Sequence, residues 1–490
     1  MNEARPDGGW TWPGPMSGTD TLFWRLSGNA LTRPHVAWVW LLEGVPDRRM
    51  FARACQGAVA RLPRLTHRVV ESPLRTGSPS WVADPDFRVS RHMHHVRLPA
   101  PGGTRELMET VEWRVSAAFD PLHPPWEITL VEGYEGDRAA VVLKWHHSLG
   151  DAVTIVAAVR RLMDNGFPAS SSQHPVSPAD REPPGAGPAD DSGVLSAVRA
   201  LGTSARGLMW ESARALAGPG RSAEGMRSTG RVAAQLLRSA APSPLLSRRS
   251  PAVHCGMVTV SLPELKAAGK AAGASVTSAY VAAVLGAVHR YHDHHGVHRD
   301  SVPVLVPVSF RQTHETGAGN LIAGALIAGP IGDMPTRARV LAVHTAITEA
   351  RDSVARGTYT MMAGLGALVP QLLYQHLAPP VLRRIDVVVT SVPGLAGTAQ
   401  VAGTRVVNAV PWAPRGGAAV NVSMASHGDL CGVGTNIDPA AITAPGLFHR
   451  FLEESFAETL QCADETPARP CVQGQEPPAH GASLPHSDDK

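Results

Sequence analysis

The stretch VVLKWHHSLGDAVT, residues 141–154, constrains the fold of this chain more than any other. The apolar run 139–145 predicts a buried strand. Apolar side chains then recur at helical spacing over residues 152–163, until Gly166 ends the pattern. Asp151 stands where the N-cap of that helix belongs. A strand that leads directly into a helix presents the polar side chains of the turn to a cleft, while the scaffold stays rigid.

The turn carries two adjacent histidines, His146 and His147. Neighbouring side chains of an extended backbone point to opposite sides, so we expect one histidine at the cleft and the other in supporting structure. A histidine at a cleft suits general-base work, because its pKa lies near neutral pH. Asp151 is better placed to hold the turn, with an arginine as its partner. The motif alone is equally compatible with His147 as a hydrogen-bonded core residue.

Composition narrows the class of protein. The 490 residues are enough for two or three domains. The net charge of +3, from 45 basic and 42 acidic residues, argues against a nucleic-acid partner. The five cysteines form no C-x-x-C pair, which favours a reducing compartment and argues against disulfide or zinc frameworks. Without a signal-peptide core or a long apolar segment, the chain is predicted to be a cytoplasmic protein.

Strands and helices alternate in two halves, which predicts an α/β protein with two related lobes. The predicted elements include strands at 35–44 and 401–410, a helix at 47–62 and an extended segment at 81–98. Residues 1–165 form the expected first lobe and residues 251–463 the second. Residues 166–250 are a predicted crossover linker, partly helical and basic, and residues 464–490 a predicted disordered tail. Within the linker, Leu195–Ser250 holds nine arginines and two glutamates. It has two interpretations: linker helices laid across the lobes, or an amphipathic patch that contacts anionic lipid headgroups.

The surroundings of the turn resemble one known family. In consistent order over most of residues 18–440, the chain is similar to the bacterial wax ester synthase/diacylglycerol acyltransferase family. That family belongs to the CoA-dependent acyltransferases with an H-H-x-x-x-D-G motif. The runs that carry the resemblance are TDTLF (19–23), FRVSRHMHHVRLPAP (87–101), FDPLHPPWEITLVEG (119–133), VPVSFR (306–311), VVVTSVPG (387–394) and NVSMAS (421–426).

The resemblance implies a fold and an activity. The fold is two chloramphenicol-acetyltransferase-like lobes, each a mixed sheet flanked by helices, with a tunnel between them. The activity is transfer of a long-chain acyl group from acyl-CoA to a hydroxyl acceptor, either a fatty alcohol or diacylglycerol, without a covalent intermediate. Acyl-CoA is then a co-substrate, and no cofactor or metal is expected. The resemblance also implies that the protein can make peripheral contact with a membrane or lipid droplet.

The resemblance also assigns roles to individual residues. It implies that His147 is the general base, with His146 packed or hydrogen-bonded behind it. Asp151 is implied to be structural, with Arg311 of the other lobe as the partner of its carboxylate. Donors to the oxyanion or to the thioester carbonyl are expected among three residues: Asn320, Thr390 and Ser391.

Departures from the family pattern keep other functions open. Ala152 stands in place of glycine, Thr277-Ser278 in place of an asparagine–aspartate pair, and Ser391 in place of asparagine. A second hypothesis is therefore an acyltransferase or condensing enzyme for a specialised metabolite or a carrier-bound intermediate. A third is a non-catalytic lipid-binding homologue. The histidine-rich runs 92–95 and 289–298 resemble metal tracts, but structural or solvent-exposed roles are favoured for both.

Overall fold

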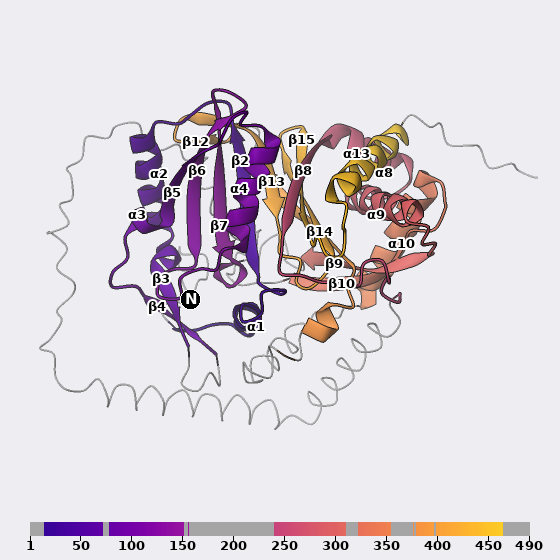
Figure 1. The fold of residues 1–490 in the computed structure, drawn as a ribbon, viewed down its shortest axis with the longest axis horizontal. Coiled ribbons are helices and arrows are strands. Elements are labelled where there is room, and N and C mark those ends of the chain that lie inside the picture. The colour runs from indigo at the N-terminus through magenta and orange to yellow at the C-terminus, as the bar shows by residue number, and fades with distance from the viewer. Residues whose placement is uncertain are drawn as a thin grey trace, which may run out of the picture.

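The computed structural model describes residues 14–71, 78–150, 155, 240–309, 322–353, 376, 379–395 and 398–463. Within these residues two six-stranded sheets, each with its own helices, form two lobes that lie side by side (Figure 1). The predicted linker helices, the predicted tail and three predicted site residues lie outside the described part of the chain. Those three site residues are Asp151, Arg311 and Asn320.

The first lobe is built on a sheet with the strand order β12-β13-β2-β7-β6-β5. Its neighbours are antiparallel except for β5 and β6. All eight residues of β2 are buried, as expected of a central strand covered on both faces. The strands are β2 (His35–Leu42), β5 (Met93–Arg97), β6 (Trp126–Tyr134), β7 (Arg138–His146), β12 (Gln400–Val401) and β13 (Thr404–Trp412).

Two helices cover the faces of this sheet. In β7, Val141 and Trp145 share a core with helix α2 (Arg48–Arg61), which begins at its N-cap Asp47. The alternate residues Ala140 and Val142 share a core with α4 (Thr104–Ser116) on the other face. This alternation follows from the two-residue period of a strand. It sends the side chain of Trp145, which directly precedes His146, toward α2.

The second lobe is built on a sheet with the order β10-β9-β11-β14-β15-β8. β9, β11 and β14 are parallel neighbours, and the remaining pairs are antiparallel. The strands are β8 (His254–Ser261), β9 (Ser301–Ser309), β10 (Ile322–Pro330), β11 (Val387–Leu395), β14 (Val420–His427) and β15 (Leu430–Ile437). The helices that share its core are α8 (Leu262–Ala271), α9 (Val276–His294), α10 (Thr336–Ser353) and α13 (Pro445–Gln461).

The second half of the chain contributes two strands to the sheet of the first lobe. β12 and β13 follow β11 in the chain, within the range 251–463 expected for the second lobe, yet they complete the first sheet beside β2. β13 also lies against β15 of the second sheet. Gly432 and Gly434 permit this approach, because a Cβ there would collide with the carbonyl oxygens of Ala409 and Pro411.

Some elements had no sequence prediction. Helix α1 (Gly18–Leu26) falls within the run TDTLF and its flanks, and β15 was not expected as a strand. Three short strands, β1 (Gly14–Pro15), β4 (Ser80–Ala83) and β3 (His67–Val70), form a small separate sheet. The segment 81–98, expected to be extended, includes the short helix α3 (Val89–His92) before β5. Two 3-10 turns, η1 (Pro63–Thr66) and η3 (His147–Leu149), complete the first lobe.

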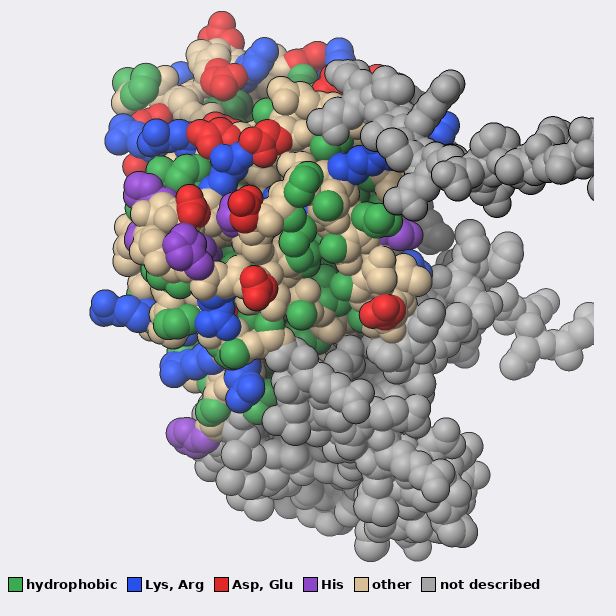
Figure 2. Space-filling view, turned by 90° about the vertical axis from the view of Figure 1, so that its right-hand side faces the viewer, with side chains coloured by type: hydrophobic (Ala, Val, Ile, Leu, Met, Phe, Trp, Pro, Cys, Tyr) green, Lys and Arg blue, Asp and Glu red, His purple; other side chains and the backbone are tan. Residues whose placement is uncertain are grey.

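The side chains on the surface and the length of the helices are the two features that concern contact with a membrane. Figure 2 shows the side of the second lobe, where acidic and basic side chains surround a central group of hydrophobic ones. None of the described helices alone is long and apolar enough to cross a bilayer. The pair α8 and α9 passes the same test together, with a bend of 95° between them, but α9 is largely buried in the core of the lobe.

Candidate functional site

The site is built on the turn that follows β7. The strand ends at His146, and η3 begins at His147. The backbone N–H of His147 donates to the carbonyl oxygen of Pro34 at 2.9 Å, which fixes the start of the turn against the segment that enters β2. Helix α1 packs across η3, and its N-cap Ser17 accepts a hydrogen bond from the backbone N–H of Asp20 at 3.1 Å.

The His147 ring is half-buried and lies flat on the Phe23 ring of α1. The ring centroids are 4.0 Å apart and the ring planes differ by 10°. Contact between two ring faces restricts rotation of the imidazole and excludes water from one of its sides. The turn therefore holds a histidine of defined orientation that keeps partial access to solvent.

The neighbouring His146 has a different environment, with a side chain only 2% exposed. Its Nδ1 accepts the backbone N–H of Ser148 at 3.1 Å and lies 2.7 Å from the Ser148 hydroxyl. Because Nδ1 is an acceptor, the proton of the neutral ring belongs on Nε2, which donates to the Ser27 hydroxyl at 2.6 Å. Burial, with His35, His147 and Lys144 nearby, holds the pKa of His146 well below 6.5. His146 is thus a neutral structural group.

The layer beneath His146 contains two further buried bases. Burial and the charge of Lys144 lower the pKa of His35 to about 3, and its Nδ1 donates to the Val115 carbonyl oxygen at 3.0 Å. Burial also lowers the pKa of Lys144 to about 8. The Lys144 ammonium donates to the Ala117 carbonyl oxygen at 2.8 Å and lies 4.1 Å from the centre of the Phe119 ring. This layer supports the turn from within the lobe.

A buried ion pair joins the turn to two other elements. Arg64 of η1 lies 3.5 Å from the carboxylate of Asp20 in α1, and both side chains are buried. The same guanidinium donates to the carbonyl oxygen of Ser148 at 3.4 Å and stacks 4.3 Å from the centre of the Trp81 ring. We call this arrangement the Asp20–Arg64 clasp. It holds α1, and with it Phe23, against the histidine turn.

Two of the three predicted oxyanion residues, Thr390 and Ser391, lie on β11 of the second sheet. The Thr390 hydroxyl donates to the side-chain oxygen of Asn421 at 3.4 Å, and Ser391 is exposed. Thr390 and Ser391 stand on a strand of the second sheet, whereas His147 follows a strand of the first. Leu395, at the end of this strand, belongs to the same hydrophobic cluster as Trp145 and Leu149, which flank the histidines in the chain. Their role as oxyanion donors stays a prediction, as does the Asp151–Arg311 pair, which lies outside the described residues.

Several residues of the site were not singled out from the sequence. Some of them lie in or beside the motifs already quoted, since Asp20 and Phe23 fall in the run TDTLF and Ser148 directly follows the histidines. Their partners are distant in the chain, and only the fold brings them together. The residues concerned are Asp20, Phe23, Ser27, Arg64 and Ser148.

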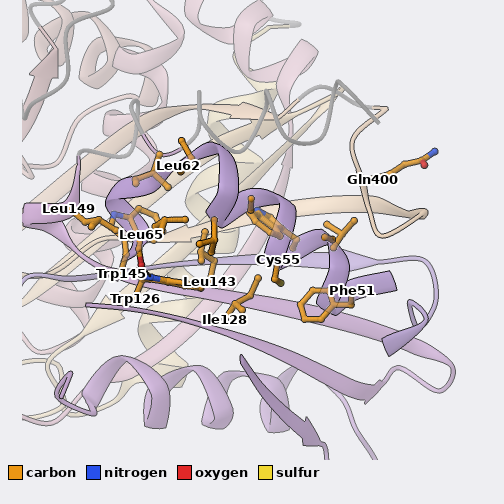
Figure 3. Close-up of a pocket in the computed structure, with 16 residues that line it drawn as sticks. Phe51, Cys55, Leu62, Leu65, Trp126, Ile128, Leu143, Trp145, Leu149 and Gln400 are labelled. Atoms are coloured by element: carbon orange, nitrogen blue, oxygen red, sulfur yellow. Dashed lines mark hydrogen bonds between the residues drawn. The ribbon is translucent and has the colours of Figure 1, made fainter. Parts of the chain in front are cut away.

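An apolar cavity of about 110 Å³ lies between α2 and the first sheet (Figure 3). Trp145 and Leu149, on either side of the histidines in the chain, both line it. The cavity lies within the first lobe, so the tunnel predicted between the lobes stays a prediction. The other lining residues are Trp40, Phe51, Ala54, Cys55, Ala58, Val59, Leu62, Leu65, Trp126, Ile128, Leu143, Ile155, Gln400 and Val401.

The histidine-rich runs take part in hydrogen bonds within the described structure. His92 donates from Nδ1 to the Trp126 carbonyl oxygen at 2.8 Å, and His95 lies 2.8 Å from the carboxylate of Glu132. His292 lies 2.8 Å from the Ser243 hydroxyl. Where the structure describes the chain, no group of three or more histidine, cysteine or acidic side chains is arranged to hold a metal ion. These contacts support structural roles for both runs.

Comparison with known proteins identifies the family whose members this chain resembles. A model described as the wax ester synthase/diacylglycerol acyltransferase catalytic domain matches residues 16–280, and one described as the corresponding C-terminal domain matches residues 318–459. A putative diacylglycerol O-acyltransferase of Mycobacterium tuberculosis is 31% identical over 452 residues, which cover 91% of each chain. A probable diacylglycerol O-acyltransferase of the same organism is 27% identical over 79% of this chain and 83% of the relative.

Solved structures share the fold. The wax ester synthase/diacylglycerol acyltransferase from Marinobacter aquaeolei superposes with a TM-score of 0.61 and 20% identity, over 92% of this chain and all of that chain. The first condensation domain of the calcium-dependent antibiotic synthetase, in complex with a substrate analogue, gives 0.58 and 15% identity, over 93% of this chain and 99% of that domain. At these identities the likeness concerns the fold alone, and it confirms the predicted two-lobe α/β architecture.

Proposed function

Since this chain belongs to the wax ester synthase/diacylglycerol acyltransferase family and is therefore an acyltransferase, we propose that His147 is its general base. The donor we propose is a long-chain acyl-CoA, and the acceptor is the hydroxyl of a fatty alcohol or of diacylglycerol. The family supports the acyl transfer itself, and the observation that supports the choice of base is the unequal environment of the two adjacent histidines.

Only one of these histidines is suited to accept a proton. His146 is buried, has a depressed pKa, and uses both ring nitrogens in hydrogen bonds to Ser27 and Ser148. His147 is half-buried, and stacking on Phe23 orients its ring. A general base must reach the substrate hydroxyl and must present a nitrogen in a fixed direction. His147 meets both requirements better than its neighbour does.

The proposed reaction needs no covalent enzyme intermediate. The acceptor hydroxyl gives its proton to the His147 imidazole while its oxygen forms a bond to the thioester carbon. The tetrahedral oxyanion then collapses, the carbon–sulfur bond breaks, and the CoA thiolate takes the proton from the imidazolium. The products are an ester and CoA, and the imidazole returns to its neutral form. General-base assistance of this kind is typically worth about 10²–10⁴-fold in rate.

Three further parts of the proposal come from the family resemblance. Asn320, Thr390 and Ser391 would donate to the oxyanion, which is a large source of stabilisation in acyl transfer. Asp151 and Arg311 would form a structural pair between the lobes. The protein would act in the cytoplasm, with peripheral contact to a membrane or lipid droplet where its apolar substrates are held.

Release of CoA thiol from palmitoyl-CoA tests the proposal. We expect release that depends on hexadecanol or diolein, and a loss of at least about 100-fold in kcat for His147→Ala. His298→Ala is the matched control, because that side chain is exposed, and it should keep wild-type activity. Equal activity of His147→Ala and the wild type would refute the assignment of the base.

The same assay separates the other hypotheses. Release that requires a polar hydroxyl or amine compound, and not a lipid, would favour a specialised acyltransferase or condensing enzyme. Tight lipid binding without turnover, unchanged by His147→Ala, would favour a non-catalytic lipid-binding protein. An acceptor screen across both lipid and polar compounds therefore decides between the three functions in one series of measurements.

A further inference from the structure

We infer that the cavity between α2 and the first sheet binds the distal part of the acyl chain of the donor, and that Cys55 and Phe51 set the chain length it accepts. The inference rests on the proposed acyl transfer and adds to it a site for one part of one substrate. It is argued from the lining of the cavity, its position relative to the histidine turn and its size.

The lining has the chemistry of a hydrocarbon site. All of its described side chains except Gln400 are hydrophobic. A cavity with an almost entirely apolar lining gives water few hydrogen-bond partners, and apolar cavities stay dry or bind apolar molecules. A buried acyl chain gains free energy roughly in proportion to the apolar surface that it removes from water. The described part of the lining holds no charged side chain to meet the phosphates of CoA, so the apolar tail of the donor is the part that fits.

The cavity lies beside the reacting centre and extends away from it. Leu149 is two residues after His147 and Trp145 two residues before it, and both side chains line the cavity. In Figure 3 these two side chains stand at one end of the lining, Cys55 stands in the middle, and Phe51 stands toward the other end. A chain with its thioester near His147 can therefore lie along α2 with its methyl end toward Phe51.

The size of the cavity limits what it can hold. A cavity of about 150 Å³ lined by aliphatic and aromatic side chains binds benzene, and this cavity measures about 110 Å³. It thus accepts a segment of several carbons and not a whole long chain. Small side chains on α2, Ala54, Cys55 and Ala58, form part of its wall. A larger side chain at any of these positions would shorten the space available to the substrate.

Substitution in the middle and at the end of the cavity should move the preferred chain length in opposite directions. Cys55→Phe fills the middle, and Phe51→Ala removes a ring from the end. Each buried methylene is worth about fourfold in affinity. We therefore expect the ratio of kcat/KM for hexadecanoyl-CoA to that for octanoyl-CoA to fall by at least about tenfold in Cys55→Phe and to rise in Phe51→Ala.

Two controls keep this test specific. Gln56→Phe adds the same ring to the exposed side of α2, and its chain-length ratio should match the wild type. The dependence on acceptor chain length, measured with alcohols from octanol to hexadecanol, should also stay unchanged in Cys55→Phe. A shift in the acceptor profile with an unchanged donor profile would overturn the inference, because the cavity would then belong to the acceptor.

Direct binding separates this inference from the proposed reaction. Calorimetry with octanoyl-CoA and hexadecanoyl-CoA, carried out in the His147→Ala background, needs no turnover. We expect Cys55→Phe to weaken the binding of hexadecanoyl-CoA at least about tenfold and the binding of octanoyl-CoA far less. If turnover is absent but this binding pattern is seen, the proposed reaction is refuted and the proposed acyl site is supported. If folded Cys55→Phe and Phe51→Ala variants bind and turn over both donors as the wild type does, the acyl site fails and the reaction stands.

Discussion

The two histidines of the turn are adjacent in the chain, yet one ends a strand and the other begins a 3-10 turn, which gives them different environments. His146 ends β7 and points into the supporting structure, where burial keeps it neutral and two serines hold its ring. His147 begins η3, outside the regular strand, and its ring lies on Phe23 at the surface of the lobe core. A single residue step thus separates a structural histidine from a candidate base.

The buried bases behind the turn make stability depend on pH. The pKa of His35 is about 3 in the folded protein, against roughly 6.5 in an unfolded chain. Between these values the unfolded chain binds more protons, so the free energy of unfolding should fall as pH decreases from about 6.5 toward 3. The expected slope is up to about 1.4 kcal/mol per pH unit for this one group. Urea denaturation at a series of pH values measures it.

Removal of the titrating ring provides the check on that slope. His35→Asn keeps a donor for the Val115 carbonyl oxygen and loses the titration, so its stability should depend less steeply on pH. His298→Asn is the control, since that side chain is 81% exposed and should leave the slope unaltered. An identical slope in His35→Asn and the wild type would mean that His35 is accessible to protons in the folded state.

At the scale of elements, the site depends on three short segments that the Asp20–Arg64 clasp draws together. α1 supplies Phe23, η1 supplies Arg64, and η3 supplies the histidine turn. None of these segments is long enough to be stable alone, because short helices need tertiary contacts. The clasp and the ring contacts therefore decide whether the candidate base is correctly oriented.

Loss of one partner of the clasp should be costly. Arg64→Met leaves the Asp20 carboxylate buried without the guanidinium, and such changes typically cost about 3–5 kcal/mol of stability. The double variant Arg64→Met with Asp20→Leu removes both charges and should recover most of that loss. Arg61→Met, at an exposed position at the end of α2, should change stability by less than about 0.5 kcal/mol. Additive losses in the double variant, measured in urea, would argue against the pairing.

The sequence predicted many elements of this fold, because buried strands and amphipathic helices have clear periods. The predicted strand 35–44 corresponds to β2, and the predicted helix 47–62 corresponds to α2. The strand–histidine part of the turn was also predictable. The ring contact with Phe23 and the ion pair with Arg64 were not, since hydrophobic and charge patterns do not specify which distant residue a side chain meets.

At the scale of the whole molecule, the two lobes are one connected structure. β13 pairs with β2 in the first sheet and also lies against β15 of the second. Between the lobes, the Trp412 indole N–H donates to the Thr435 carbonyl oxygen at 3.1 Å. The apolar period of residues 401–410 predicted a strand and placed it in the second half. That period carries no information about which sheet a strand joins, so the pairing of β13 with β2 could not be predicted from the sequence.

This shared strand leads to a prediction for the contact between the lobes. Gly434 faces the backbone of β13, and a Cβ there would collide with the Pro411 carbonyl oxygen and crowd the Trp412 ring. Overpacking typically costs about 1–3 kcal/mol, and Gly434→Val should reach or exceed the upper value, because a backbone carbonyl cannot rotate away as a flexible side chain can.

Gly44→Ala is the matched control, since a Cβ at that position meets no atom within 4 Å. Thermal unfolding should show a clear loss of stability for Gly434→Val and almost none for Gly44→Ala. Equal melting temperatures for Gly434→Val and the wild type would mean that β13 and β15 are not in close contact in solution, and that the lobes are joined through the chain alone.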